Sequence, residues 1–285
     1  MYVLCSPCIL SPSLRANGIT KPEDLHNFEN AIQRCRKFNI DMVPLPCPET
    51  LYLGPDREPG TYLERLNTSE FASLIEKLVK LVFDIIVDRG PPLCILGVNS
   101  SPTCGVTTTY YGDEGGRPPK RVGRGVFLSR FSEIAAMDVS TFSRYRIYLA
   151  APLFSEAERA YNRNVTTLLE RNLFEVYLPQ DEGDGSAIRN SDEQRQLFSR
   201  NLSALERSDI VVAIVDGADA DSGTGWEMGF AVARNKPVIA LRTDFRHVGD
   251  FERVNLMLEQ SSVVVTDASQ LLQAINSPVN RSADV

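Results

Sequence analysis

The chain has 285 residues, of which 43% are hydrophobic and 24% charged, so it can bury a core and is neither disordered nor fibrous. Its formal charge of -7 argues against nucleic acid or an anionic membrane as its main partner. No apolar run approaches the roughly 20 residues that cross a bilayer, and the N-terminus lacks the features of a secretory signal, so we expect a cytoplasmic protein.

Helical and extended segments are mixed in the first half of the chain. Helical periodicity predicts helices over Lys21–Phe38 and Ser69–Arg89. Short apolar runs predict extended segments at Met42–Leu45 and Leu93–Val98. The segment Gly112–Gly125 is rich in glycine, proline and basic residues, which is typical of a loop.

Strands and helices alternate regularly in the second half, which indicates a parallel sheet with helices on both faces. We therefore predict an α/β fold of two domains, residues 1–135 and residues 144–285, the second a doubly wound sheet of the Rossmann or flavodoxin type. Its predicted elements are strands at Arg146–Ala150, Phe174–Leu178, Asp209–Val215, Pro237–Leu241 and Ser261–Val265, and helices from the cap residue Ser155 to Arg171 and at Glu193–Ser208, Trp226–Asn235 and Ala268–Asn276.

Two segments of the second half end or follow predicted strands, and open parallel sheets bind ligands beyond the carboxyl ends of their strands. They are Tyr148–Ser155 and Asp216–Glu227. The glycines of the second segment permit a tight turn and a close approach of a ligand, but they fit neither a dinucleotide-binding motif nor a P-loop. Glu227 is expected in the first turn of the next helix, directed at the ligand crevice.

Four carboxylates crowd the second of these segments. Like charges held together cost free energy unless they are used, so Asp216, Asp219 and Asp221 beside Glu227 are candidates for function. The alternative is structural, because such residues also complement helix dipoles or serve in turns and caps.

An ordered set of motifs resembles the nucleoside 2-deoxyribosyltransferase family over about residues 144–275. The resemblance implies nucleoside or nucleobase substrates and no cofactor for this domain. The motifs are Tyr148–Ser155, Asp209–Ala213, Asp221–Gly229 and Lys236–Ile239.

This resemblance implies a role for each matching residue. Glu227 is the nucleophile at the sugar C1′ and forms a covalent glycosyl intermediate, while Tyr148 orients it. Asp221 and Asp216 hold or protonate the nucleobase, and the assignment among Asp216, Asp219 and Asp221 is open.

Further substrate contacts are expected from Gly223, Phe154 and Ser155. The family also completes each site with a segment from a neighbouring subunit. Asn255 and Met257 match that segment, so a homo-oligomer is expected.

All six cysteines lie in the first 104 residues, and they are too sparse for a disulfide scaffold. Cys8, Cys47 and Cys104 each sit in a turn rich in proline or glycine, an environment typical of iron–sulfur ligands. Cys35 and Cys94 lie within helical and strand patterns, which favours buried thiols that act as small hydrophobic groups.

The segments around these three cysteines resemble the 2-thiouracil desulfurase family over roughly residues 2–131. The resemblance implies that Cys8, Cys47 and Cys104 hold a [4Fe–4S] cluster with one iron open to take sulfur from a thiolated base. It places Glu49 and Ser101 near the substrate. The matching segments are Cys8 with Arg15–Gly18, Pro46–Glu49 with Leu53–Gly54, and Asn99–Val106.

Both halves therefore point to nucleobases, and the chain is interpreted as a bifunctional enzyme whose main activity is N-glycosidic bond transfer or cleavage. Neither a nucleic acid polymer nor a membrane is expected as a partner. Three alternatives stay open. In the first, the chain is chiefly a desulfurase. In the second, it is a nucleoside 5′-monophosphate N-glycosidase, and Ser155 and Arg159 hold the phosphate at a helix N-terminus. In the third, it is a nucleotide sensor without catalytic activity, and Glu227 or Tyr148 is turned away from the pocket.

Overall fold

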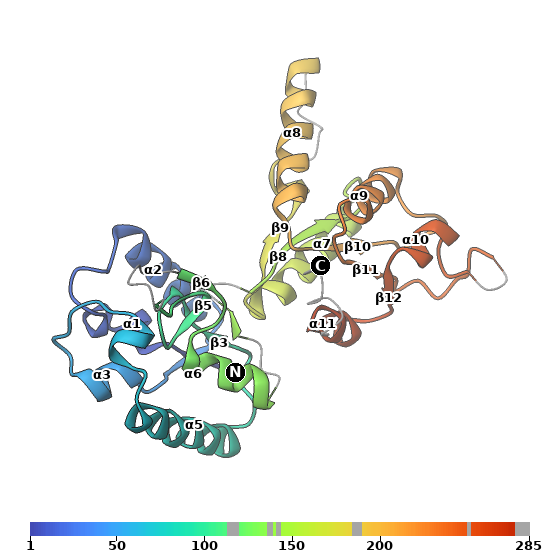
Figure 1. Ribbon diagram of the computed structural model, residues 1–285. Helices are drawn as coiled ribbons and strands as arrows, with labels where there is room; N and C mark the ends of the chain where they lie inside the picture. Colours follow the sequence, from blue (N-terminus) through green and yellow to red (C-terminus); the bar gives the residue numbers. More distant parts are fainter. Residues whose placement is uncertain (113–119, 136–138, 141–143, 184–189, 250–251, 277–285) are drawn as a thin grey trace. The chain divides into compact units, whose positions relative to one another are not determined.

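A computed structural model describes residues 1–112, 120–135, 139–140, 144–183, 190–249 and 252–276 (Figure 1). Contacts divide the chain into two compact units, Met1–Arg144 and Tyr145–Val285. In the described part of the chain, no helix is long and apolar enough to cross a membrane.

The N-terminal unit contains a four-stranded parallel sheet in the order β2-β1-β3-β7 and a three-stranded sheet in the order β4-β5-β6. Long helices and several short turns of helix surround these sheets (Figure 1). The elements are β1 (Tyr2–Cys5), α1 (Pro7–Leu10), η1 (Pro12–Leu14), α2 (Pro22–Lys37), β2 (Asp41–Pro44), α3 (Pro48–Leu53), α4 (Tyr62–Arg65), α5 (Ser69–Arg89), β3 (Ile95–Leu96), β4 (Val98–Ser100), β5 (Gly105–Tyr110), β6 (Lys120–Val122), α6 (Val126–Ala135) and β7 (Val139–Ser140).

Two predictions for this unit need correction. The single strand expected at Leu93–Val98 is two short strands that belong to different sheets. They separate at Gly97, where a Cβ atom would come 2.9 Å from the Cys104 carbonyl oxygen and closer still to the Val106 and Leu128 side chains, so a side chain here would force its neighbours to move. The loop expected at Gly112–Gly125 contains β6, which pairs with β5, and residues 113–119 of that loop lie outside the described residues.

The C-terminal unit is built on five parallel strands in the order β12-β11-β10-β8-β9. Numbered within the unit this order is 5-4-3-1-2, that of a flavodoxin-like doubly wound sheet, and the predicted fold class is confirmed. The elements are β8 (Arg146–Ala150), α7 (Glu156–Arg171), β9 (Glu175–Tyr177), η2 (Pro179–Asp181), α8 (Ser191–Arg207), β10 (Ile210–Ile214), α9 (Ser222–Ala233), β11 (Val238–Leu241), α10 (Leu256–Gln260), β12 (Val263–Val265) and α11 (Ala268–Asn276).

Helices cover both faces of this sheet because its central strand is apolar on both sides. From β10, Val212 packs with α7 and α11, whereas Val211 packs with α8 and α9. The strand order reverses between β8 and β10, so the carboxyl ends of these two strands border the crevice where doubly wound sheets bind ligands.

Helix α9 begins earlier than its sequence pattern predicts. The expected start was Trp226, but the helix begins at Ser222, and Asp221 caps it by accepting a hydrogen bond from the Thr224 N–H. The cap offsets the low helix propensity of the two glycines in the first turn. Glu227 therefore lies in the second turn of α9 rather than the first.

Candidate functional site

The centre of the candidate site is a tyrosine–glutamate pair. Strand β8 carries Tyr148, which is fully buried, and α9 carries Glu227. The Tyr148 hydroxyl donates a short hydrogen bond to Oε1 of Glu227. The two residues are 79 positions apart in the chain, and the parallel pairing of β8 with β10 brings them together at the reversal of strand order.

Burial changes the acidity of both members of this pair. Burial raises the pKa of Glu227 to about 7; the hydrogen bond from Tyr148 lowers it, and the charge of Asp221 raises it. Burial also raises the pKa of Tyr148, and the Glu227 charge adds to that shift. Near neutral pH, Glu227 therefore exchanges readily between its carboxylate and carboxylic acid forms, while Tyr148 remains a hydrogen-bond donor.

The raised pKa of Glu227 predicts a pH-dependent effect on stability. The folded chain binds this proton more tightly than the unfolded chain, so its stability falls as pH rises from about 4.5 through 7, by about 3 kcal/mol. Glu227→Gln removes the titration and should make the chain more stable than its parent at pH 8, with little difference at pH 4.5. Urea unfolding at both pH values measures this, and the exposed Glu156→Gln is the control. An equal stability difference at the two pH values would contradict the assignment.

Asp221 lies beside Glu227 and has a structural role as well. Its Oδ2 accepts the Thr224 N–H at 3.1 Å, which caps α9. Its charge is one of the causes of the Glu227 shift. A Cβ atom at Gly223 would come 3.0 Å from the same carboxylate oxygen, so the glycine leaves room for the cap.

The other two aspartates of the segment are engaged by the backbone. Asp216 accepts hydrogen bonds from the Thr243 N–H, the Thr243 hydroxyl and the Asp244 N–H at 2.6–2.8 Å, which joins the loops after β10 and β11. Asp219 is exposed and accepts the Ala220 N–H. These bonds favour the turn-residue alternative for both, and Asp221 is the aspartate whose charge acts on Glu227.

The N-terminus of α7 is closed by its own side chains. Ser155 and Glu158 form a capping box, in which the Glu158 carboxylate accepts the Phe154 and Ser155 N–H groups at 3.0 and 2.7 Å. Arg159 donates to the carbonyl oxygens of Leu153 and Phe154. A phosphate bound here would compete with an internal carboxylate for these donors.

Asn255 and Met257 lie at the start of α10. The Asn255 side chain caps this helix by accepting the Met257 N–H at 3.0 Å. The Met257 side chain is 75% exposed, and Phe154 in the loop after β8 is 72% exposed. Both apolar side chains are thus available for contact with another molecule.

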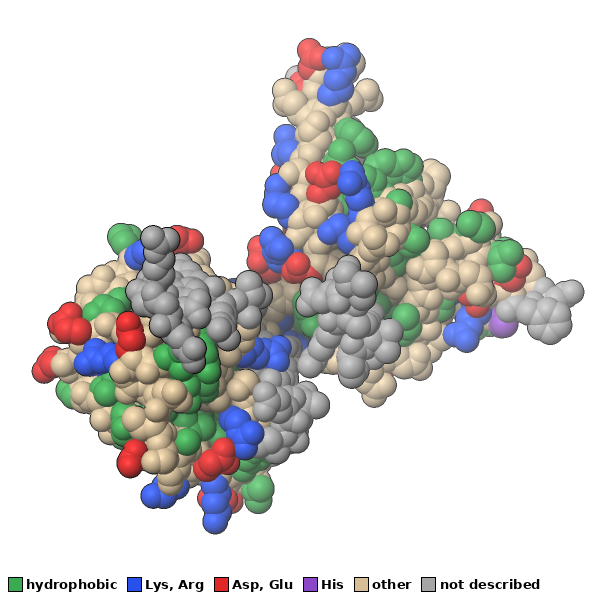
Figure 2. Space-filling view, in the orientation of Figure 1, with side chains coloured by type: hydrophobic (Ala, Val, Ile, Leu, Met, Phe, Trp, Pro, Cys, Tyr) green, Lys and Arg blue, Asp and Glu red, His purple; other side chains and the backbone are tan. Residues whose placement is uncertain are grey.

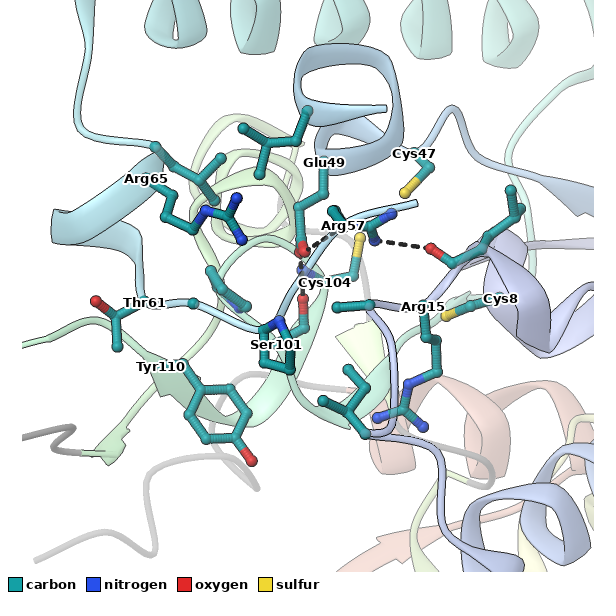
Figure 3. A pocket seen from close by; sticks show the side chains of 18 of the residues that line it. Cys8, Arg15, Cys47, Glu49, Arg57, Thr61, Arg65, Ser101, Cys104 and Tyr110 are labelled. Atoms are coloured by element: carbon teal, nitrogen blue, oxygen red, sulfur yellow. Dashed lines mark hydrogen bonds and ion pairs between the residues drawn. The ribbon is translucent and has the colours of Figure 1, made fainter. Parts of the chain in front are cut away.

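The N-terminal unit has a cavity of about 410 Å³ lined by Cys8, Cys47 and Cys104 (Figure 3). These cysteines come from α1, from the residue before α3 and from the turn before β5. Burial raises the pKa of Cys8 to about 12 and that of Cys104 well above its usual value, and the three thiols lie close enough to affect one another. Cys35 and Cys94 are buried elsewhere.

A network of polar side chains borders the same cavity. Glu49 Oε1 accepts hydrogen bonds from the Ser101 and Thr103 hydroxyls at 3.0 and 2.7 Å. The buried Arg57 guanidinium lies 3.5 Å from Glu49 Oε2 and donates to the Leu14 carbonyl at 2.7 Å. Sequence reasoning assigned no role to Arg57, which lies outside the matching segments, or to Thr103, which lies inside Asn99–Val106 but was not singled out there.

Cys8, Cys47 and Cys104 line the same cavity (Figure 3). In the described ranges, no group of three or more His, Cys, Asp or Glu side chains is arranged to hold a single metal ion. An iron–sulfur cluster binds each thiolate through a different iron, so it requires sulfur donors around one space. The donor set of Cys8, Cys47 and Cys104 fits that requirement.

The C-terminal unit thus combines a doubly wound sheet with a buried glutamate at the point where the strand order reverses, and comparison with known proteins shows its family. The family model for nucleoside 2-deoxyribosyltransferase matches residues 147–267. The nucleoside deoxyribosyltransferase of Limosilactobacillus fermentum is 32% identical in an alignment 124 residues long that covers 40% of this chain and 73% of that protein. A putative 2′-deoxynucleoside 5′-phosphate N-hydrolase 1 of Thermofilum pendens is 26% identical over 49% of this chain and 99% of its own.

Among solved structures, the 2-deoxyribosyltransferase of Bacillus psychrosaccharolyticus is similar, with 23% identity, a TM-score of 0.39 and coverage of 44% of this chain and 89% of that one. Through its C-terminal unit, the chain belongs to the nucleoside 2-deoxyribosyltransferase family. It is an enzyme of the kind that family contains, nucleoside deoxyribosyltransferases and N-glycosidases. The family model lies within the C-terminal unit, so the desulfurase resemblance of the N-terminal unit stays a prediction.

Proposed function

We propose that the C-terminal unit breaks the N-glycosidic bond of a 2′-deoxynucleoside through a covalent intermediate on Glu227. The observation that carries this proposal is the buried Tyr148–Glu227 pair at the reversal point of the sheet. A lone pair of the Glu227 carboxylate forms a bond to C1′, and the electrons of the C1′–N bond leave with the base. Asp221 holds the departing base and supplies its proton. A second base or water then takes the sugar from Glu227.

Incubation with a deoxynucleoside, with and without a second free base, tests this proposal. Formation of a new nucleoside in the presence of the second base indicates transfer, and release of free base without an acceptor indicates hydrolysis. Chromatography separates the products. If the folded chain yields neither product over a set of purine and pyrimidine deoxynucleosides, the proposal is wrong.

The arrangement around α7 supports an unphosphorylated substrate. The donors expected to hold a 5′-phosphate are engaged by Glu158, and the Arg159 side chain is bonded to carbonyl oxygens. We expect kcat/KM for a deoxynucleoside to exceed that for its 5′-monophosphate. The sensor alternative required Glu227 or Tyr148 to face away from the site, whereas the two are bonded to each other.

A homo-oligomer completes the site in this proposal. Asn255 and Met257 of one copy contact the substrate bound by the next, which the exposure of Met257 supports. Light scattering at micromolar concentration should show at least a dimer. Met257→Asp should raise KM about tenfold or more, because a charge replaces an apolar contact. A monomer with full activity would contradict this part of the proposal.

We further propose that Cys8, Cys47 and Cys104 hold a [4Fe–4S] cluster in the N-terminal unit, with Glu49 and Ser101 beside the substrate. When bound, the cluster would supply a Lewis-acidic iron that binds the sulfur of a thiolated nucleobase. The convergence of these five residues on one cavity supports this second function. The Glu49 carboxylate, held by the Ser101 hydroxyl, is placed to orient the base by hydrogen bonds.

Anaerobic reconstitution with iron and sulfide tests the cluster. The parent chain should bind about four irons and show the visible absorption of a cluster. Cys47→Ser should lose both, whereas the buried Cys94→Ser should keep them. Equal iron content in the two variants would contradict the ligand assignment. Cys47→Ser should also leave base release intact. That result would show that the two proposed activities are independent, whereas an enzyme that is chiefly a desulfurase would lose its main activity.

A further inference from the structure

We infer that Tyr177 and Asn201 are positioning residues that hold Tyr148 against Glu227 from behind. This inference rests on the proposed role of Glu227 as the reacting carboxylate. Neither residue belongs to the motifs that pointed to the site, and neither has a role in the mechanism proposed above.

The rings of Tyr148 and Tyr177 form a stacked pair. The parallel register of β8 and β9 sets these residues directly opposite each other. Their ring centroids are 5.5 Å apart, with an interplanar angle of 20°. Because Tyr148 is fully buried, the stack restricts the plane of its ring and hence the direction in which its hydroxyl donates.

Asn201 anchors the outer member of this stack. The Tyr177 hydroxyl donates its proton to Oδ1 of Asn201 at 2.8 Å. This bond holds the Tyr177 ring in place against the Tyr148 ring. In the described part of the chain, Tyr148 is the side chain that donates to Glu227, through Oε1. The other carboxylate oxygen, Oε2, is thereby left for the reaction.

The same face of α8 also supports the helix that carries Glu227. Phe198 lies three residues before Asn201, and its ring meets the Trp226 ring edge-on at 6.0 Å. Trp226 immediately precedes Glu227 in α9. Both rings are about half exposed, and Figure 2 shows hydrophobic side chains on the surface beside α8. Helix α8 thus contacts both halves of the pair, Tyr148 through Tyr177 and Glu227 through Trp226.

Loss of the Tyr177–Asn201 bond should change the pKa of Glu227 in one direction. The hydrogen bond from Tyr148 lowers the pKa of Glu227, so a loosened Tyr148 ring should raise that pKa further. The charged groups near Tyr177 are Glu182, Arg200, Arg207 and Glu227. Of these, Glu182 and Arg200 form an ion pair at 3.5 Å on the exposed side. Removing the neutral Tyr177–Asn201 bond changes none of these charges.

Two substitutions that each remove the bond test the inference. Tyr177→Phe keeps the ring stack, and Asn201→Ala keeps α8 helical because alanine is a strong helix former. We expect each to raise the pKa of Glu227 by up to about one unit and to lower kcat about tenfold, with KM changed less than about twofold. The double variant should match the single ones, because all three lack the same bond. Tyr145→Phe is the control, since Tyr145 stacks on Phe174 in the other core cluster.

NMR titration of chain labelled with ¹³C-glutamate measures the pKa of Glu227 without any substrate, and Glu227→Gln assigns its signal. A raised pKa in both variants with no base release even by the parent chain supports the positioning pair and rejects the proposed reaction. An active parent chain whose two variants keep the same pKa and kcat overturns the positioning pair and leaves the reaction standing. Additive effects in the double variant would also overturn it. If Tyr177→Phe does not fold, Asn201→Ala carries the test.

Discussion

Replacing Glu227 by Gln should reduce base release from a deoxynucleoside by about 10⁴-fold or more. The amide has nearly the shape of the carboxyl group and can still accept the hydrogen bond from Tyr148, but it has no charge with which to trap the sugar at C1′. Losses of this size are typical when a covalent nucleophile is removed. Initial rates measured by chromatography, with single-turnover sensitivity, give the ratio.

Two further observations make this test specific. Glu156→Gln changes an exposed glutamate in the same unit and should leave the rate within about twofold. Mass spectrometry of the parent chain, quenched during turnover, should show one deoxyribosyl group on the peptide that contains Glu227. A variant that retains more than a tenth of the parent rate would show that Glu227 is not the nucleophile.

Asp221→Asn should lower the rate by about 10²–10⁴-fold for substrates whose base must be protonated as it leaves, which is the usual range for loss of a general acid. Asparagine is as good a helix cap as aspartate, so its Oδ1 can still accept the Thr224 N–H and α9 should keep its start. The variant therefore separates the chemical role of Asp221 from its capping role. A set of bases with graded leaving-group ability, assayed side by side, measures the effect.

The exposed Asp219 provides a matched control for this experiment. Asp219→Asn lies in the same segment and should change the rate less than about twofold, because its side chain bonds the adjacent backbone. The loss in Asp221→Asn should shrink as the leaving base improves. A uniform loss below tenfold across the set of bases would contradict a proton-transfer role for Asp221.

The elements that the sequence predicted well are those whose signals are local. The amphipathic pattern of α5 gave its bounds, Ser69–Arg89, because burial of one face requires helical periodicity. The apolar run at β10 indicated a strand buried on both faces, and the alternation of strands with helices indicated the doubly wound sheet. The start of α9 was missed because the low helix propensity of two glycines suggested a loop, although Asp221 caps the helix before them.

In the candidate site too, local motifs indicated some of the residues, whereas only tertiary contacts revealed the others. Motif resemblance pointed to Glu227, Tyr148 and Asp221, but the sequence could not show that Asp216 is bonded to the loop after β11. That bond joins residues 27 positions apart, and only the parallel neighbours β10 and β11 bring the two loops together. Tyr177 and Asn201 were missed for the same reason, since strand register and helix docking decide what touches Tyr148.

By itself, the sequence determined the fold class of the C-terminal unit, the family to which it belongs and the residues able to carry its chemistry, because periodicity, caps and motifs are properties of short segments. The tertiary structure alone decided which of those residues meet and how acidic they are. The pKa of Glu227 rises because packed strands and helices exclude water from a carboxyl group that an isolated peptide would leave solvated. The three cysteines of the N-terminal unit share a cavity because turns distant in sequence fold around one space.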